Sequence, residues 1–232
     1  GKDIIMNRKQ ICKMIDHTSL KPQATEEDIR KLCGEAKEYG FASVCTNTCY
    51  LPLCRELLKG SDVKKCVVIG FPLGAMATEA KVFEAMYARD NGADEIDMVI
   101  NVGAVKAGRY STAEYDIRAV REAAGDKTLK VIIETGLLTD GEKIQAVRIC
   151  ARAGADFVKT CTGFSQGQAT AEDIRLIKAE LDALRAAKKC GDIKIKASGG
   201  IRNLASAIEL IEAGADRLGA SAGVAIAREA GE

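Results

Sequence analysis

The feature that most constrains the fold is a recurring unit in which a glycine ends a helical stretch and a short apolar run follows. Four copies align by eye: "YGFASVCTN", "NGADEIDMVIN", "AGADFVKTCTG" and "AGADRLGASAG". A glycine that follows a helix commonly adopts the left-handed conformation that stops it. The short apolar run after it is typical of a buried strand. The chain is therefore predicted to alternate helices with strands.

Extending this pattern along the chain predicts about eight strands and eight helices. The expected strands are 14–19, 42–47, 66–71, 95–101, 129–134, 156–161, 193–198 and 216–220. The expected helices are 25–39, 49–59, 78–91, 112–124, 139–153, 170–188, 203–213 and 222–229, with a short extra helix at 6–13. Thr25, Thr78 and Thr139 are expected to cap three of these helices.

Strands that alternate with helices form parallel sheets through right-handed crossovers. Eight such units in 232 residues fit an α/β protein of the (β/α)8 TIM-barrel type. An open doubly wound sheet is the alternative. Because no linker or shift in composition divides the sequence, residues 1–232 are expected to form a single barrel domain.

Composition argues against several classes of partner. Lys and Arg number 34 against 33 Asp and Glu, so the net charge is +1, which does not favour nucleic acid or an acidic membrane as partner. No apolar run reaches the ~18 residues of a membrane span. The sequence contains neither a Walker A motif nor G-x-G-x-x-G, so a nucleotide cofactor is not expected.

The nine cysteines include no C-x-x-C pair and suit reduced thiols in a cytoplasmic protein. Cys45, Cys49 and Cys54 have the wrong spacing for zinc, and His17 is the only histidine that would help. We therefore expect no metal. His17 itself is expected to have a structural role.

In a (β/α)8 barrel the active site lies at the C-terminal ends of the strands. Near those predicted ends the sequence places an unusually polar set: Asp16, His17, Thr18, Cys45, Asn47, Asp97, Asn101, Glu134, Lys159, Thr160, Lys196, Ser198 and Ser221.

Lys159 stands inside the otherwise apolar stretch "GADFVKTCTGF". Burial lowers the pKa of a lysine and so provides the free amine that a Schiff-base nucleophile needs. A lone strand lysine is more often a snorkelling or ion-paired group. Lys196, in "DIKIKASGG", changes that balance, because a second ammonium would lower the pKa of Lys159 further. Lys194 is expected to be structural.

Asp97 shares a strand face with Glu95 and Val99 by the two-residue period. It is expected to pair with a lysine, either as a buried ion pair or as a proton-transfer group. The glycine-rich segments "SGGIRN" and "GASAG" each join a strand to a helix, and their backbone N–H groups are candidates for binding phosphate. Plain turns also need glycine there. With His17 preceding Ser221, "GASAG" is not a hydrolase nucleophile elbow.

Seven motifs together resemble the deoxyribose-phosphate aldolase family of class I aldolases. They are "IDHTSLKP", "VIGFPLGA", "GADEIDMVINVGA", "KVIIETGLL", "GADFVKTCTGF", "KASGGIR" and "GASAGVAI", and they span Ile15 to Ile226 in order. The resemblance implies a TIM barrel that reversibly cleaves 2-deoxy-D-ribose 5-phosphate to D-glyceraldehyde 3-phosphate and acetaldehyde, in the catabolism of deoxyribose phosphates. It implies no cofactor, and an assembly of two or four copies.

The resemblance also assigns roles to residues. Lys159 matches the Schiff-base lysine, Lys196 the lysine that perturbs it, and Asp97 the proton-relay aspartate. Residues that match positions contacting the substrate or its phosphate are Asp16, Thr18, Thr162, Gly163, Gly199, Gly200, Gly219 and Ser221. The chain departs from the family pattern at Cys161, Thr46, Thr48 and Ala222.

Two further classes of function stay open at this point. One is another phosphosugar-binding barrel lyase or isomerase, and the other is a catalytically silent barrel that serves as a scaffold.

Overall fold

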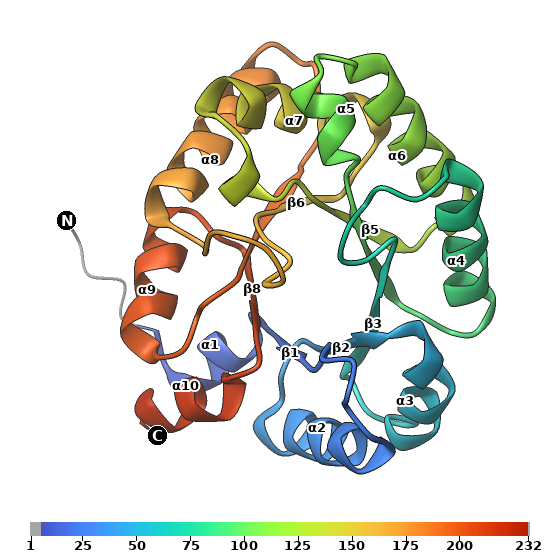
Figure 1. Ribbon diagram of the computed structural model, residues 1–232. Helices are drawn as coiled ribbons and strands as arrows, with labels where there is room; N and C mark the ends of the chain where they lie inside the picture. Colours follow the sequence, from blue (N-terminus) through green and yellow to red (C-terminus); the bar gives the residue numbers. More distant parts are fainter. Residues whose placement is uncertain (1–5, 232) are drawn as a thin grey trace.

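The computed structural model describes residues 6–231, and they form a closed barrel of parallel strands surrounded by helices (Figure 1). Strands β1 (Ile15–Thr18) and β8 (Arg217–Ala220) close the ring, with Asp16 opposite Gly219. An open sheet would leave these two strands as edges. The predicted (β/α)8 barrel is therefore confirmed and the doubly wound alternative is wrong. Residues 1–5 and 232 of the expected domain lie outside the described residues.

All eight predicted strands are present, with shifted ends. The other six are β2 Ser43–Asn47, β3 Lys64–Ile69, β4 Glu95–Val99, β5 Thr128–Ile132, β6 Phe157–Lys159 and β7 Lys194–Ser198. No strand end differs from its prediction by more than two residues, and β6 ends at Lys159 instead of the predicted 161. Thr160 and the residues after it therefore belong to the loop that leads to the next helix.

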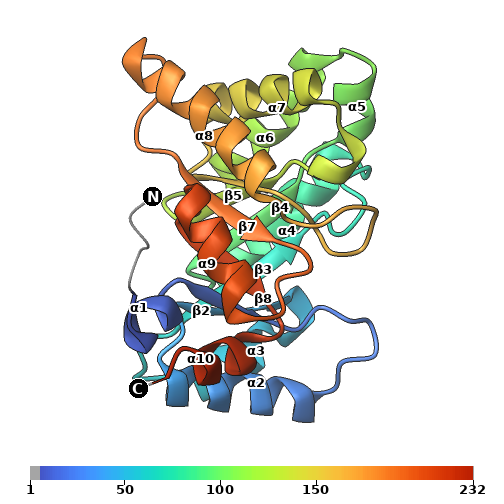
Figure 2. The same cartoon turned by 90° about the vertical axis from the view of Figure 1, so that its left-hand side faces the viewer.

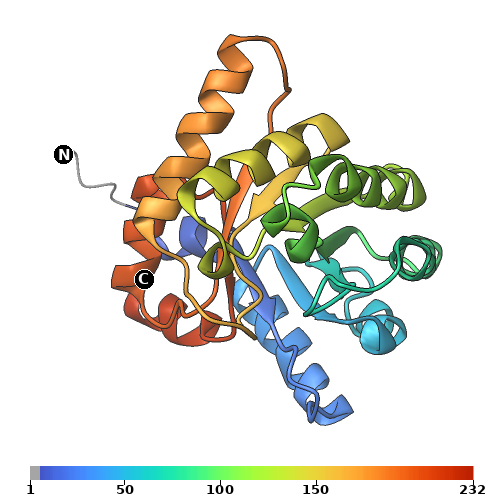
Figure 3. The ribbon, with the colours of Figure 1, turned by 45° about the horizontal axis from the view of Figure 1, so that its top comes forward.

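The helices form the outer layer, which Figure 2 shows from the side. They are α1 Arg8–Cys12, α2 Glu26–Tyr39, α3 Leu51–Leu57, α4 Thr78–Asp90, α5 Val102–Lys106, α6 Tyr110–Ala124, α7 Asp140–Ala153, α8 Ala171–Ala186, α9 Leu204–Ala213 and α10 Gly223–Glu229. The predicted extra helix is α1, which packs beside α10. Helix α8 is the longest at 16 residues, and its far end projects from the outer layer (Figure 3).

Three short helical segments were not predicted as such: α5 and the 3₁₀ turns η1 (Thr48–Tyr50) and η2 (Thr135–Leu137). Segments of three to five residues are too short to show a helical period. Local chemistry forms α5 instead, since the Asn101 side chain accepts the Ala104 N–H at 3.1 Å.

Two of the three predicted helix caps are confirmed. The side chains of Thr25 and Thr139 accept the N–H three residues on and complete capping boxes with Asp28 and Glu142. The prediction for Thr78 is wrong, because Ala77 precedes α4 and makes no side-chain cap. Thr78 lies inside the helix and donates its hydroxyl to Asp116 at 2.8 Å.

Strand alternation divides the side chains of β4 between two environments. Ile96 and Met98 pack into the apolar core between sheet and helices. Glu95 and Asp97 face the opposite way, into the barrel, where they meet charged groups from other strands. The barrel interior therefore holds a buried polar cluster inside an aliphatic shell.

Candidate active site

Lys159 is the last residue of β6 and is 3% exposed. Its Nζ donates to Asp97 Oδ2 at 3.0 Å. The residues that follow form a loop, so the lysine lies at the C-terminal end of the strand. This is the position at which a barrel displays its reactive groups.

Lys196 lies directly beside Lys159, since the two residues are register partners in β6 and β7. Its Nζ donates to the same oxygen, Asp97 Oδ2, at 2.8 Å and lies 2.6 Å from Asp16 Oδ2. The structure thus brings the three predicted catalytic residues together. One carboxylate oxygen bridges the two lysines.

The cluster is larger than the sequence reasoning expected. Lys130 of β5 is completely buried, and its Nζ lies 3.0 Å from Asp16 Oδ2, 2.8 Å from Glu95 Oε1 and 3.1 Å from Asp97 Oδ1. Arg217 Nη1 lies 2.8 Å from both Asp16 Oδ1 and Glu95 Oε1. Four cationic side chains thus face three carboxylates. The signal that was missed is the same as for Lys159, a lysine within an apolar run, "TLKVIIE".

The charges of the cluster hold each other in the ionised state. Burial raises the pKa of Asp16 and Asp97, but the neighbouring cations outweigh it and hold both pKa values below the ordinary range. Burial lowers the pKa of Lys130 and Lys196, yet the carboxylates raise both well above the ordinary lysine value. Lys196 is therefore a fixed positive charge and Asp97 a fixed negative one.

One set of metal-type donors lies in this cluster. The thiols of Cys45 and Cys66 and a carboxylate oxygen of Asp97 all lie within 4.8 Å of one another. The Asp97 oxygens already accept bonds from Lys159, Lys196 and Cys66, and Lys130 lies 3.5 Å from the Cys66 thiol. A cation here would be repelled by three ammonium groups, so this set serves hydrogen bonding.

The predicted phosphate-binding residues lie around the same end of the barrel. Gly199 and Gly200 follow β7, Gly219 lies in β8, and Ser221 and Gly163 follow β8 and β6. At Gly199 and Gly200 φ is +102° and +74°, a conformation that requires glycine in practice. A Cβ on Gly219 would lie 3.0 Å from Lys196 Cε, so this glycine makes room for the lysine.

The two predicted pocket threonines are held by their own surroundings. Thr18 donates its hydroxyl to the Asp16 carbonyl at 2.8 Å. Thr162, in the loop after β6, donates to the Glu134 carboxylate at 2.6 Å. These hydrogen bonds do not involve the lysines, so the predicted roles of the two threonines toward a substrate stay predictions. Cys161, where the chain departs from the family pattern, is buried beside Thr135, with 3.2 Å between Sγ and Oγ1.

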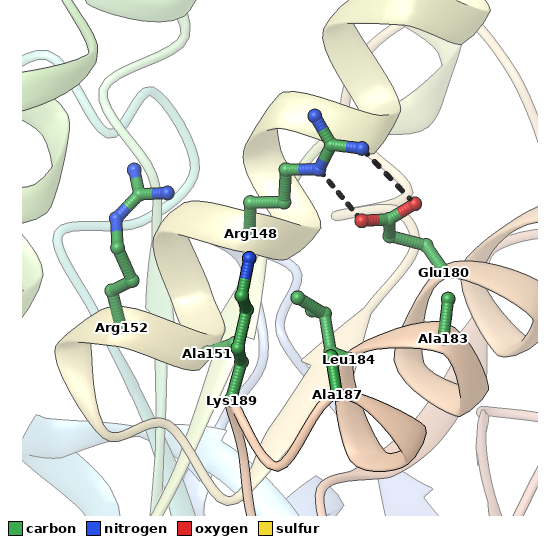
Figure 4. Close-up of a pocket in the computed structure, with 8 residues that line it drawn as sticks. All are labelled: Arg148, Ala151, Arg152, Glu180, Ala183, Leu184, Ala187 and Lys189. Atoms are coloured by element: carbon green, nitrogen blue, oxygen red, sulfur yellow. Dashed lines mark hydrogen bonds and ion pairs between the residues drawn. The ribbon is translucent and has the colours of Figure 1, made fainter.

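Several features lie apart from this cluster. His17 points to the helix layer, where its Nε2 lies 3.4 Å from Glu35 and its ring packs against Phe41, as expected of a structural histidine. Lys194 begins β7 and is exposed. A pocket of about 680 Å³ lies outside the barrel between α7 and α8, where Arg148 and Glu180 form an ion pair at its edge (Figure 4).

A closed parallel barrel with a buried lysine at a strand end, bridged to a second lysine by a carboxylate, is the arrangement expected of a barrel aldolase. Comparison with known proteins agrees. Residues 10–230 match the model of the DeoC/LacD family aldolases, and the chain belongs to this family. It is thus an aldolase, a lyase, and the family resemblance seen in its motifs is confirmed.

The curated relatives are similar along nearly their whole length. The chain is 56% identical to deoxyribose-phosphate aldolase 1 of Bacillus licheniformis, covering 95% of this chain and 96% of that protein. It is 54% identical to deoxyribose-phosphate aldolase of Clostridium tetani, covering 95% and 99%. A solved structure of deoxyribose phosphate aldolase from Aeropyrum pernix superposes with a TM-score of 0.84 at 32% identity, covering 95% and 91%, and is described as tetrameric.

Proposed function

We propose that this chain reversibly cleaves 2-deoxy-D-ribose 5-phosphate to D-glyceraldehyde 3-phosphate and acetaldehyde. Its relatives in Bacillus licheniformis and Clostridium tetani are named deoxyribose-phosphate aldolases, which supports this proposal. The observation that carries the proposal is the shared oxygen of Asp97, which accepts a hydrogen bond from Lys159 at 3.0 Å and from Lys196 at 2.8 Å. An amine nucleophile, a carboxylate and a fixed cation are the groups this chemistry needs.

The reaction would begin when the neutral amine of Lys159 attacks C1 of the open-chain sugar. Loss of water from the carbinolamine gives an iminium, which acts as an electron sink. The C3 hydroxyl then loses its proton through a water held by Asp97 and Lys196. The C2–C3 bond breaks, glyceraldehyde 3-phosphate leaves, and the electron pair forms an enamine. Protonation at C2 and hydrolysis release acetaldehyde and restore Lys159.

Asp97 and Lys196 suit the proton step because their charges are fixed. The pKa of Asp97 is held low and that of Lys196 high, so both keep their charge while the proton moves through water. That Lys159 attacks as a neutral amine is part of this proposal.

The phosphate of the substrate would bind at the loops after β6, β7 and β8, through Gly163, Gly199, Gly200, Gly219 and Ser221. Ser221 and Gly200 are exposed, and glycine backbone can approach an anion closely. Asp16, Thr18 and Thr162 would line the sugar end. Holding the phosphate fixes C1 against Lys159, which is the positioning contribution to the rate.

We also propose where and in what form the enzyme acts. Residues 1–232 would act as one aldolase domain with a small sugar phosphate as partner and no cofactor, assembled as a homodimer or homotetramer. Among residues 6–231 no helix is both apolar enough and long enough to cross a bilayer. All nine cysteines are free thiols, which supports a reducing compartment, the cytoplasm.

A cleavage assay with matched lysine variants tests the reaction. The wild type should release acetaldehyde from 2-deoxyribose 5-phosphate. Lys159→Ala should abolish the release, whereas Lys194→Ala, on an exposed lysine of β7, should keep it. Absence of release by the wild type, or full release by Lys159→Ala, would refute the proposal.

A further inference from the structure

Glu134 has an unusual backbone for its residue type. It follows β5 with φ +57° and ψ +64°, the left-handed region that non-glycine residues seldom occupy, and it is 3% exposed. Such conformations persist where the surroundings over-determine them, and they cluster at functional sites. The contacts of its carboxylate show what this conformation achieves.

Both oxygens of the Glu134 carboxylate accept hydrogen bonds from Thr162. Oε1 accepts the backbone N–H of Thr162 at 3.1 Å, and Oε2 accepts the Thr162 hydroxyl at 2.6 Å. Thr162 lies three residues beyond Lys159, in the loop that follows β6. Glu134 thus connects the end of β5 to the loop that carries the predicted sugar-binding threonine.

The next residues hold the two segments together. Thr135 donates its N–H to the Thr160 carbonyl at 3.1 Å. A Cβ on Gly136 would lie 2.0 Å from the Gln166 carbonyl oxygen, so the two backbones touch only because this residue is glycine. These contacts fix the backbone of the loop before and after Thr162. The direction of the Thr162 hydroxyl proton is then set by its hydrogen bond to Glu134.

The hydrogen-bond capacity of Thr162 is nearly used up. A threonine hydroxyl has one donor and two acceptor lone pairs. The donor goes to Glu134 Oε2, and one lone pair accepts the Phe164 N–H at 3.0 Å. Because a carboxylate only accepts hydrogen bonds, it forces the proton toward itself. One acceptor position is left on Thr162.

We propose that Glu134 is a positioning residue which fixes the Thr162 hydroxyl as a hydrogen-bond acceptor, so that Thr162 binds a hydroxyl group of the sugar and not its phosphate or carbonyl oxygens. This rests on the proposed function and names the part of the substrate that Thr162 contacts. A substrate hydroxyl donates to Thr162, whereas phosphate oxygens need donors and are left to the glycine-rich loops.

Glu134→Gln reverses this polarity with little change of shape. The Thr162 backbone N–H can only donate, so the glutamine oxygen must face it. The amide NH2 then faces the Thr162 hydroxyl and donates to it. The Thr162 hydroxyl then accepts hydrogen bonds from two N–H groups, that of Phe164 and that of the glutamine, and must direct its own proton toward the substrate. There it faces the proton of the sugar hydroxyl, so neither group can accept from the other.

The experiment compares Glu134→Gln with the wild type and with Glu142→Gln, a matched substitution at a capping carboxylate outside the barrel. We expect KM for 2-deoxyribose 5-phosphate to rise about 10-fold in Glu134→Gln, the cost of one hydrogen bond to the substrate. Borohydride trapping with acetaldehyde alone, which lacks a sugar hydroxyl, should proceed within about 2-fold of the wild-type rate, and it also shows that the variant is folded. Glu142→Gln should match the wild type in both.

A double variant separates positioning from general damage. In a Thr162→Val background the added Glu134→Gln should not raise KM further, because the hydroxyl that it directs is gone. An unchanged KM in Glu134→Gln, or an equal rise in the Thr162→Val background, would overturn the inference while leaving the proposed reaction intact. A wild type that neither cleaves the sugar phosphate nor is trapped by acetaldehyde overturns both.

Discussion

Asp97 has two functions at the scale of the single residue. In the proposed mechanism it holds the water that carries the C3 proton. In the fold it neutralises Lys130, Lys159 and Lys196, all within 3.1 Å of its oxygens. The sequence left both interpretations open, a buried ion pair and a proton-transfer group. In the structure, an Asp97→Asn substitution leaves these buried ammonium groups without their shared counter-charge.

We therefore expect Asp97→Asn to lower kcat by about 10²- to 10⁴-fold and the free energy of unfolding by about 3–5 kcal/mol, the cost of breaking a buried ion pair. Urea denaturation and the acetaldehyde-release assay measure the two effects. Asp94→Asn, at a half-exposed carboxylate paired with Lys65, serves as control and should change stability by about 1 kcal/mol or less. Asp97→Asn with wild-type stability would show that the cluster does not depend on its charge.

Charged residues within apolar strands differ in how visible they are from the sequence. Lys159, Lys196 and Asp97 stood out because charge within an apolar strand is costly. Lys130 has the same signal and begins the motif "KVIIETGLL", but it was missed because it lies near the start of the expected strand 129–134, away from the strand end where functional residues were sought. Glu134 was noted only as a polar strand end, since its function depends on a backbone angle and on a partner 28 residues away.

Helices and strands could be predicted where the residues that determine them are close together in the sequence. The long helices, their glycine ends and the caps at Thr25 and Thr139 follow from nearby residues and were found. Strand ends were less accurate, because the length of β6 depends on the neighbouring strands with which it pairs. Thr78 fits a cap by sequence, yet its hydroxyl is drawn to Asp116, 38 residues further along the chain.

The cap of α7 gives a test at this scale. Thr139→Ala removes the acceptor for the Glu142 N–H and should lower the free energy of unfolding by about 1 kcal/mol. Thr139→Ser retains a hydroxyl and should restore most of that loss. Thermal or urea unfolding of the two variants measures the difference, and equal stability of Thr139→Ala and the wild type would argue against the cap.

For the whole molecule, the barrel brings together side chains from strands that are far apart in sequence. Asp16 of β1 and Arg217 of β8 are 201 residues apart, yet 2.8 Å separates their charged groups. Alternation of strands and helices predicted the barrel, but the pairing inside it depends on which side chains meet across the interior. For this reason Lys159 and Lys196 could be predicted to lie together, and the full charged cluster could not.

The cluster also makes stability depend on pH. Asp16 and Asp97 have lower pKa values in the folded protein than in the unfolded chain, so folding favours their ionised forms. Their contribution is fully present above the unfolded pKa of about 3.9 and is lost as pH falls through the folded values. The raised pKa of Lys196 acts in the opposite direction, and its contribution is lost only as pH rises above about 10.4. The urea midpoint should thus fall steeply below about pH 4; a constant midpoint from pH 5 to pH 2 would contradict this.

The proposed mechanism requires a Schiff base between Lys159 and the substrate, and borohydride trapping followed by mass mapping detects this bond. Reduction of the enzyme in the presence of acetaldehyde should add one ethyl group, and peptide mapping should place it on Lys159 in the wild type and find none in Lys159→Ala. An ethyl group on Lys130 or Lys196 in place of Lys159, or no specific adduct at all, would contradict the mechanism.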